Sequence, residues 1–205
     1  MRNLALFLLL AAAFNLLTVA ALPRLINAFV MHRIVKLAID EAAHPHDYAS
    51  ARSPGADARR ASILANGGYN VALPTHRADA NARTVVRPSP DLLYTVCVFD
   101  LAKGTLHITA PVPDSYASVS GFAADTSNFF ALNDQTAGVA ADGKKRFEVM
   151  LSRHAPGKVA VGTRVIVSPS DRGIVLFRTL ITDDAALPGL QANIQNQQNC
   201  VLTPG

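Results

Sequence analysis

The chain contains an uncharged apolar run near its amino terminus, and this run restricts every fold that the chain can adopt. Residues 3–23 carry no charge and consist mostly of Leu, Ala, Phe and Val. About 20 apolar residues are enough to cross a bilayer as a helix. The run therefore predicts a transmembrane anchor over residues 1–23. A cleaved signal peptide is the alternative, because Val19 and Ala21 would stand before a cut at Leu22.

The apolar pattern continues beyond Arg24 at helical spacing, at positions 25, 26, 29, 30, 34, 37 and 39. It predicts that the anchor extends into an amphipathic helix at the membrane surface. Charges on residues 33, 36, 40 and 41 exclude a second crossing. Basic residues flank the run more heavily on its carboxyl side, so the positive-inside rule on its own places the body in the cytoplasm.

The remainder of the chain is patterned as strands. Only two of the fifteen acidic residues are glutamate, and aspartate favours turns over helices. Apolar and polar residues alternate in several short segments, which predicts strands at 92–99, 105–110, 116–122, 126–132, 145–151, 163–168 and 173–181. We expect a mainly β fold, an antiparallel β-sandwich or open barrel, with a short helix over residues 187–200.

Three segments follow from these patterns: the anchor at 1–23, an amphipathic helix with a linker at 24–60, and a β domain at 61–205. Residues 44–60 are rich in Ala, Ser, Pro and charge, so they are interpreted as a linker or exposed loop. A short turn of helix is expected after Ser62, ended by Asn66-Gly67-Gly68.

The charge distribution argues against nucleic acid as a partner. The net charge is +4, and residues 24–87 carry nine basic and five acidic groups. This positive excess lies beside the apolar run, where anionic lipid headgroups would attract it, although a solvated basic linker explains it equally well. The cluster at residues 144–146 has no interleaved aromatic residues, so the sequence gives no sign of a nucleic-acid site.

Aspartates at strand ends are the first candidates for chemistry, at positions 91, 100, 114, 125 and 134. Such aspartates usually cap turns by bonding to their own backbone. Asp125 and Asn128 are the best candidates for a pocket at the rim of the sheet. A hydrolase or isomerase using Asp91, Tyr94, Asp125 and Asn128 is the competing hypothesis to a binding module, and the sequence does not specify a reaction.

No motif predicts a cofactor or a metal. His44, His46 and Asp47 form a short cluster, but a zinc site needs three or four ligands at suitable spacing. Residues 138–144 match most of a phosphate-binding loop, with Lys145 in place of the Ser or Thr that holds magnesium. We interpret that segment as a hairpin turn.

The two cysteines, Cys97 and Cys200, leave two interpretations open. An even cysteine count in an exported protein suggests a disulfide. Two unrelated buried thiols are the alternative.

The central block resembles a bacterial family of unknown function, DUF1254. The shared features are Pro88-x-Pro90-Asp91-x-Leu93-Tyr94, Phe99-Asp100-Leu101, a turn at Pro111, and Asp125-x-x-Asn128-Phe129. The short, membrane-anchored members are most similar, through residues 21–24, 128–134 and 176–180 and the positions of both cysteines. Longer relatives favour an Asn-Pro-Asp-Thr sequence, where this chain has Ser89 and Leu92.

This resemblance implies an envelope location facing the periplasm, a largely β body and no assigned catalysis. It also favours a bridge between Cys97 and Cys200. We therefore expect a single-pass inner-membrane protein whose periplasmic body binds an envelope protein or a small ligand.

Overall fold

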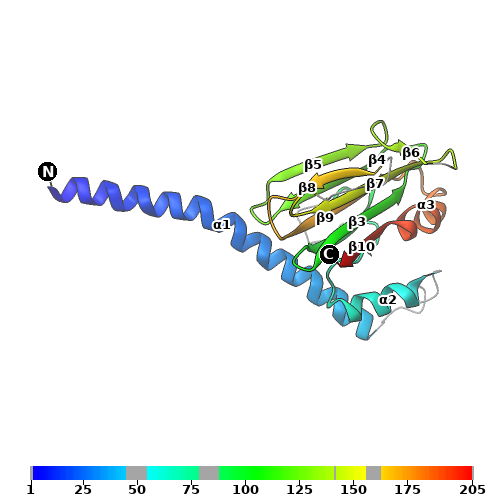
Figure 1. The fold of residues 1–205 in the computed structure, drawn as a ribbon, viewed down its shortest axis with the longest axis horizontal. Coiled ribbons are helices and arrows are strands. Elements are labelled where there is room, and N and C mark those ends of the chain that lie inside the picture. The colour runs from blue at the N-terminus through cyan, green and yellow to red at the C-terminus, as the bar shows by residue number, and fades with distance from the viewer. Residues whose placement is uncertain (1, 45–54, 79–87, 141, 156–162, 205) are drawn as a thin grey trace.

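The computed structural model describes residues 2–44, 55–78, 88–140, 142–155 and 163–204 (Figure 1). Helix α1 runs from Arg2 to Ala43 without a break, and Pro23 lies inside it. By length and composition the helix is able to cross a membrane, and none of its most apolar window is buried. The predicted helical extension beyond Arg24 is confirmed.

Helix α2, Ala56–Ala65, follows α1 and packs against its end. Ile63 of α2 is buried with Ala42 of α1 and with Val71. The predicted linker over 44–60 is therefore wrong for its last five residues, which α2 orders through this packing. The helix ends as predicted, because Gly67 and Gly68 follow it with φ angles of 58° and 76°.

One sheet, sheet A, has five antiparallel strands in the order β1-β2-β9-β4-β5. Its strands are β1 (Leu73–Pro74), β2 (Leu92–Asp100), β9 (Arg172–Leu180), β4 (Ala117–Ala123) and β5 (Asn128–Asn133). The long strands β2 and β9 pair along their whole length, from Leu92 opposite Leu180 to Asp100 opposite Arg172. They form the centre of the sheet.

The second sheet, sheet B, has the order β10-β3-β7-β6, with β8 also paired to β7. Its strands are β10 (Asn199–Pro204), β3 (Gly104–Pro111), β7 (Lys145–Ser152), β6 (Gly138–Val139) and β8 (Arg164–Val167). Only β8 runs parallel to its neighbour among the described pairs. The turn between β6 and β7 is the hairpin predicted for residues 138–144, with Gly143 at a φ of 77°.

The two sheets face each other and are not closed into a barrel, so the fold is the predicted sandwich (Figure 1). Alternate residues of the long strands point between the sheets and form one apolar core. Its largest fully buried side chains are Phe99, Phe177, Leu106, Ile108 and Leu151. All seven predicted strands are present.

The carboxyl end of the chain departs from prediction. Helix α3 spans Leu187–Asn193, a 3-10 turn, η2, spans Gln195–Gln197, and strand β10 then begins at Asn199. The predicted helix over 187–200 is thus wrong in its last part. The reason is tertiary, since β10 pairs with β3 from Asn199 opposite Thr109 to Pro204 opposite Gly104. Pairing with a strand that is distant in sequence thus fixes where the helical part ends.

A disulfide joins the two sheets, between Cys97 of β2 and Cys200 of β10. The cysteines are 103 residues apart in sequence and both are almost completely buried. Closing a loop of that length stabilises a fold by about 4.7 kcal/mol in the chain-entropy model. The bond therefore fixes the last strand to the centre of the other sheet.

Gly173 allows three strands to approach one another, and this gives the first prediction. A β-carbon there would overlap the carbonyl oxygen of Phe122 and the ring of Phe99. We expect Gly173→Ala to lower the free energy of unfolding by about 1–3 kcal/mol, the usual cost of overpacking. Thermal unfolding of the full chain in mild detergent measures the change.

Gly189→Ala is the matched control for this substitution. Gly189 lies in α3, and a β-carbon added to it would meet no other atom within 4 Å. Alanine in a helix is more stable than glycine by about 1 kcal/mol, so this variant should be neutral or more stable. Equal stability of the two variants would show that the strands are not as tightly packed at Gly173.

Candidate functional site

The second half of α1 is built into the β domain, and its junction with sheet A is the first candidate site. Asn27 is 5% exposed, and its Nδ2 donates hydrogen bonds to the carbonyl oxygens of Ala123 (2.8 Å) and Ala124 (3.2 Å). Farther along, Met31 and Val35 pack with Val98 of β2. These contacts hold α1 across the outer face of sheet A.

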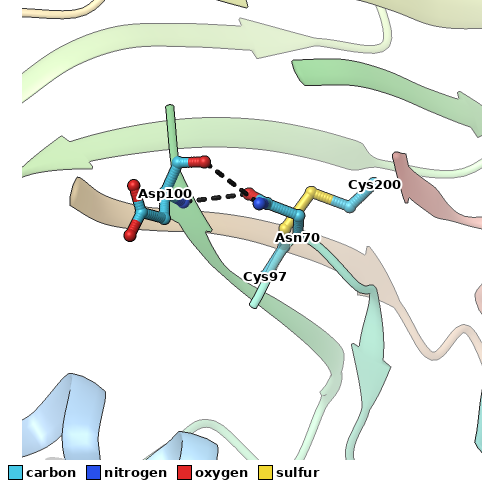
Figure 2. Close-up of a disulfide and its surroundings, with 4 residues drawn as sticks. All are labelled: Asn70, Cys97, Asp100 and Cys200. Atoms are coloured by element: carbon cyan, nitrogen blue, oxygen red, sulfur yellow. Dashed lines mark hydrogen bonds between the residues drawn. A yellow bond between two sulfur atoms is a disulfide. The ribbon is translucent and has the colours of Figure 1, made fainter. Parts of the chain in front are cut away.

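A turn before β1 completes the junction. Asn70 has a left-handed backbone, with a φ of 56°. Its Nδ2 donates to the carbonyl oxygen of Asp100 at 3.0 Å, and its Oδ1 accepts from the backbone N–H of Asp100 at 2.9 Å (Figure 2). Its own N–H donates to the carbonyl oxygen of Val98 at 2.8 Å. Asn70 thus pairs with the end of β2 as a strand residue would.

Charged and aromatic groups cover this turn. The guanidinium of Arg172 lies 5.5 Å from the ring centroid of Tyr69, and its Nε bonds to Oδ2 of Asp100 at 2.8 Å. This hydrogen bond, more than any other influence, raises the pKa of Arg172 above its ordinary value. The arrangement is a surface ion pair stacked on an aromatic ring, and such groups orient a loop more than they stabilise it.

The candidates Asp91 and Tyr94 lie at one end of sheet A and both bond to Ser89. The backbone N–H of Ser89 donates to the hydroxyl of Tyr94 at 2.9 Å, and Oγ of Ser89 accepts from the N–H of Asp91 at 3.3 Å. The carbonyl oxygen of Asp91 accepts from Ile181. Both residues therefore serve the turn that enters β2.

The predicted pair Asp125 and Asn128 lies in the hairpin between β4 and β5. Oδ1 of Asp125 accepts hydrogen bonds from Oγ (2.6 Å) and N–H (3.1 Å) of Ser127. The hydroxyl bond is the main cause that lowers the pKa of Asp125, and the charge of Arg24 adds to it. Nδ2 of Asn128 donates to the carbonyl oxygens of Gly121 and Phe130, where β5 has one extra residue opposite Gly121 and Phe122 of β4. These are the turn contacts that such residues commonly make.

The structure does not bring these two pairs together. Asp91 precedes the Leu92–Leu180 pair at one end of sheet A, and Asp125 follows the Ala123–Gly173 pair at the other. Leu180 and Gly173 are seven residues apart on β9, which corresponds to about 23 Å of strand. A single rim pocket that uses all four predicted residues is therefore not formed.

A different set of polar atoms was missed in the sequence, and two of its members lie inside the sandwich. Among the described residues, four buried side-chain atoms have no hydrogen-bond partner, on Thr95, Ser115, Thr179 and Gln198. Thr95 and Thr179 are 1% exposed and point toward the core from β2 and β9, at the Tyr94 end of sheet A. We call these four residues the polar end.

The polar end is closed by η2. Gln195 donates from Nε2 to the carbonyl oxygens of Thr75 (2.9 Å) and Tyr94 (2.8 Å), next to Thr95. Gln198 follows η2 and precedes Asn199, which pairs with β3. Threonine in a strand is an ordinary β-former, so the sequence carried no signal for this cluster. Hydroxyl and amide groups without charge are suited to neutral polar molecules.

The remaining candidate features do not form a metal site or a large pocket within the described residues. His44 is the first residue after α1, while His46 and Asp47 lie outside the described residues. Within the described ranges, no group of three or more His, Cys, Asp or Glu residues is placed to hold a metal ion. A hollow of about 80 Å³ near Glu148 and Arg164 is small beside the roughly 300–1,000 Å³ of small-molecule pockets.

Fold and site together define a two-sheet β domain, stapled by a disulfide, that carries a long apolar helix on the outer face of one sheet. The family described as "Protein of unknown function (DUF1254)" matches residues 69–201. The chain belongs to this family. The match begins at Tyr69, in the turn that pairs with β2, and ends one residue after the disulfide.

Two solved structures are similar to the chain. The VPA0106 protein from Vibrio parahaemolyticus shares 15% identity over 90% of this chain and 38% of its own, with a TM-score of 0.48. A putative uncharacterized protein from Burkholderia cenocepacia shares 15% identity over 71% of this chain and 42% of its own, with a TM-score of 0.46. The chain thus spans less than half the length of either. No curated protein matches it.

The Asn70 contacts lead to a second prediction. Asn70→Ala removes both bonds to Asp100 and keeps an unfavourable left-handed backbone, so we expect a loss of about 2 kcal/mol in unfolding free energy. Asn70→Gly removes the same bonds but adopts the backbone freely, and should lose about 1 kcal/mol less. Unfolding in mild detergent measures both. Equal losses would mean that the backbone of residue 70 contributes nothing.

The polar end leads to a third prediction. Thr95→Val keeps the shape of the side chain and removes a buried hydroxyl that has no protein partner. We expect the unfolding free energy to rise by about 1 kcal/mol, while the half-buried control Thr109→Val changes little. A clear fall for Thr95→Val would instead show that the hydroxyl makes a stabilising hydrogen bond.

Proposed function

We propose that this protein is a single-pass inner-membrane protein whose β domain faces the periplasm and acts by binding an envelope protein or a small ligand. The observation that carries the proposal is the division of α1 into two parts. The first part is exposed, whereas one side of the second part, from Asn27 onward, is buried against sheet A and α2. One rigid helix thus links an apolar rod to the domain (Figure 1).

The dimensions of the first part suit a bilayer. Its large apolar side chains from Leu4 to Val19 are between 57% and 72% exposed. The 21 uncharged residues at 3–23 extend about 32 Å as a helix, close to the roughly 30 Å of a hydrocarbon core. Water would solvate such a surface poorly, and a bilayer buries all of it.

The disulfide supports the periplasmic orientation. Disulfides form and persist in oxidising compartments and are rare in the cytosol. Cys97 and Cys200 join the two sheets at the centre of the fold, so a reducing compartment would remove a main constraint on β10. We weigh this above the count of flanking basic residues, which differs by a small number of charges.

Binding is favoured over catalysis by the use of the candidate residues. Asp91 and Tyr94 are engaged at the turn into β2, and Asp125 and Asn128 in a hairpin at the opposite end of the sheet. General acid–base chemistry needs such groups within reach of one substrate atom. For a small ligand we favour the uncharged polar end, because its unpartnered hydroxyl and amide atoms are able to bond to a neutral polar group.

Fusions at the carboxyl terminus give the fourth prediction. A fusion to a phosphatase that is active only outside the cytoplasm should show activity. A fusion to a fluorescent protein that matures only in the cytoplasm should show no fluorescence. Cys97 and Cys200 should resist alkylation in cells until a reductant is added. The chain should remain with the membranes after alkaline carbonate extraction, at the mass of the uncleaved sequence.

A variant that lacks residues 2–23 is the control for these fusions. It should stay in the cytoplasm, its fluorescent fusion should fluoresce, and both of its thiols should react with an alkylating reagent. A full chain that behaves in the same way would contradict the periplasmic orientation. A chain found at the mass expected after a cut at Leu22 would contradict the anchor in favour of a signal peptide.

A further inference from the structure

We infer that α1 leaves the bilayer obliquely, and that its outer face beyond the span is a contact surface for anionic lipid headgroups. The outer face is defined as Leu25, Ile26, Phe29, Arg33 and Lys36. The inference rests on the proposed anchor and adds where the helix exits, which side faces the membrane and which lipids it contacts. The observations that carry it are the burial, the helical phase and the charge order of these residues.

Helical geometry places the outer face opposite the docked face. At 100° per residue, Leu25, Ile26, Phe29, Arg33 and Lys36 fall within an arc of about 100°. Residues 24, 27, 31 and 35 lie on the other side of the helix. Burial agrees with this phase, because Phe29 is 64% exposed and Asn27 is 5% exposed.

The boundary between apolar and polar residues differs on the two sides. On the side of the domain, polar groups begin at Arg24 and Asn27, and the charge of Arg24 is felt by Asp125. On the outer side, large exposed apolar residues continue through Leu25 (66%), Ile26 (52%) and Phe29 (64%), and the first charge is Arg33. The two first charges are nine residues apart, about 14 Å along the helix axis.

A bilayer surface that follows this boundary crosses the helix at a slant. It covers the outer face as far as Phe29 and leaves the opposite side free from Arg24 onward. The domain then lies on the side of the helix that faces away from the lipid. Figure 1 shows both sheets on one side of the second half of α1, which leaves the outer face accessible.

The first charges on the outer face are basic and indicate the lipid, and the acidic Asp40 follows them on the same arc. Arg33 and Lys36 are exposed and follow Phe29 by one to two turns on the same face, about 6–10 Å farther along the helix. Basic side chains at that height extend their amines and guanidinium groups to anionic headgroups, while their stems stay on apolar surface. The apolar part of the face is also continuous with the uncharged span, so one bilayer covers both.

The absence of tryptophan from the sequence makes a direct test available. Single substitutions Phe14→Trp, Phe29→Trp and Val139→Trp give one probe each in the full, disulfide-bonded chain. Val139 is 67% exposed on β6, at the far end of the domain from α1's amino terminus, and serves as the unquenched reference (Figure 1). The chains are reconstituted into vesicles of zwitterionic and anionic phospholipids that carry bromine at defined depths.

We expect the quenching of each tryptophan to depend on its depth in the bilayer. Phe14→Trp should be quenched most by bromine near the bilayer centre. Phe29→Trp should lose roughly half of its emission to bromine placed near the headgroups, since interfacial helices bury their apolar side about 5–10 Å deep. Val139→Trp should be unaffected.

The outcomes separate this inference from the anchor. Quenching at Phe14→Trp with none at Phe29→Trp would overturn the oblique exit and leave the anchor intact. No quenching at either position would overturn both. The emission maximum of Phe29→Trp could instead shift to shorter wavelength as the protein-to-lipid ratio rises, without quenching. That result would show a second copy on the outer face and would also overturn the inference.

Charge reversal tests the headgroup contact. In the Phe29→Trp background, Arg33→Glu with Lys36→Glu should abolish the extra headgroup-level quenching that anionic lipid produces over zwitterionic lipid. Lys144→Glu, in the turn before β7, with Arg164→Glu on β8 makes the same charge change at two exposed positions of the domain and should retain that difference. Equal behaviour of the two double variants would overturn the assignment of these basic residues to anionic lipid.

Discussion

The junction at Asn27 is the constraint on which the rest of the structure depends. A buried amide that bonds to the carbonyl oxygens of Ala123 and Ala124 fixes the height at which α1 meets sheet A. Met31 and Val35 then pack over Val98, and Ala42 packs against Ile63 of α2. Because an unpaired buried amide is costly, the helix has one favourable position along the sheet. The domain is therefore oriented relative to the helix.

Inside the domain, the disulfide and the polar end lie at different positions along the strands. The disulfide between Cys97 and Cys200 holds β10 over β2 at the centre. Toward the Tyr94 end, the apolar core gives way to the hydroxyls and amide of the polar end. Apolar packing supplies most of the stability of such a sandwich, whereas buried hydroxyls without partners lower it. The polar end is thus the place where the interior departs from what stability alone would select.

The strands could be predicted from the sequence because their signal is local. Each of the long strands alternates between core and surface, and the turns carry Gly, Pro or Asp. Strand β10 could not be predicted, because its partner β3 is about 90 residues away and a six-residue segment carries little pattern of its own. The candidate site was predicted less well. Asp125 and Asn128 carry the residue types of a site, but Ser127 and the bulge opposite Gly121 engage them. Thr95 and Thr179 come together only through the pairing of β2 with β9.

The match to the family starts at Tyr69, so α1 and α2 lie outside it. Yet α1 covers part of the domain's own surface. Val98 is fully buried although it points away from the core between the sheets, and Ile174 beside it is half-buried, because Met31 and Val35 lie over them. Without the second half of α1, this apolar patch of sheet A would face water. The helix is therefore a third layer of the domain as well as a tether. Its docked length, from Asn27 to Ala42, belongs to the folding unit, and the apolar run before it does not.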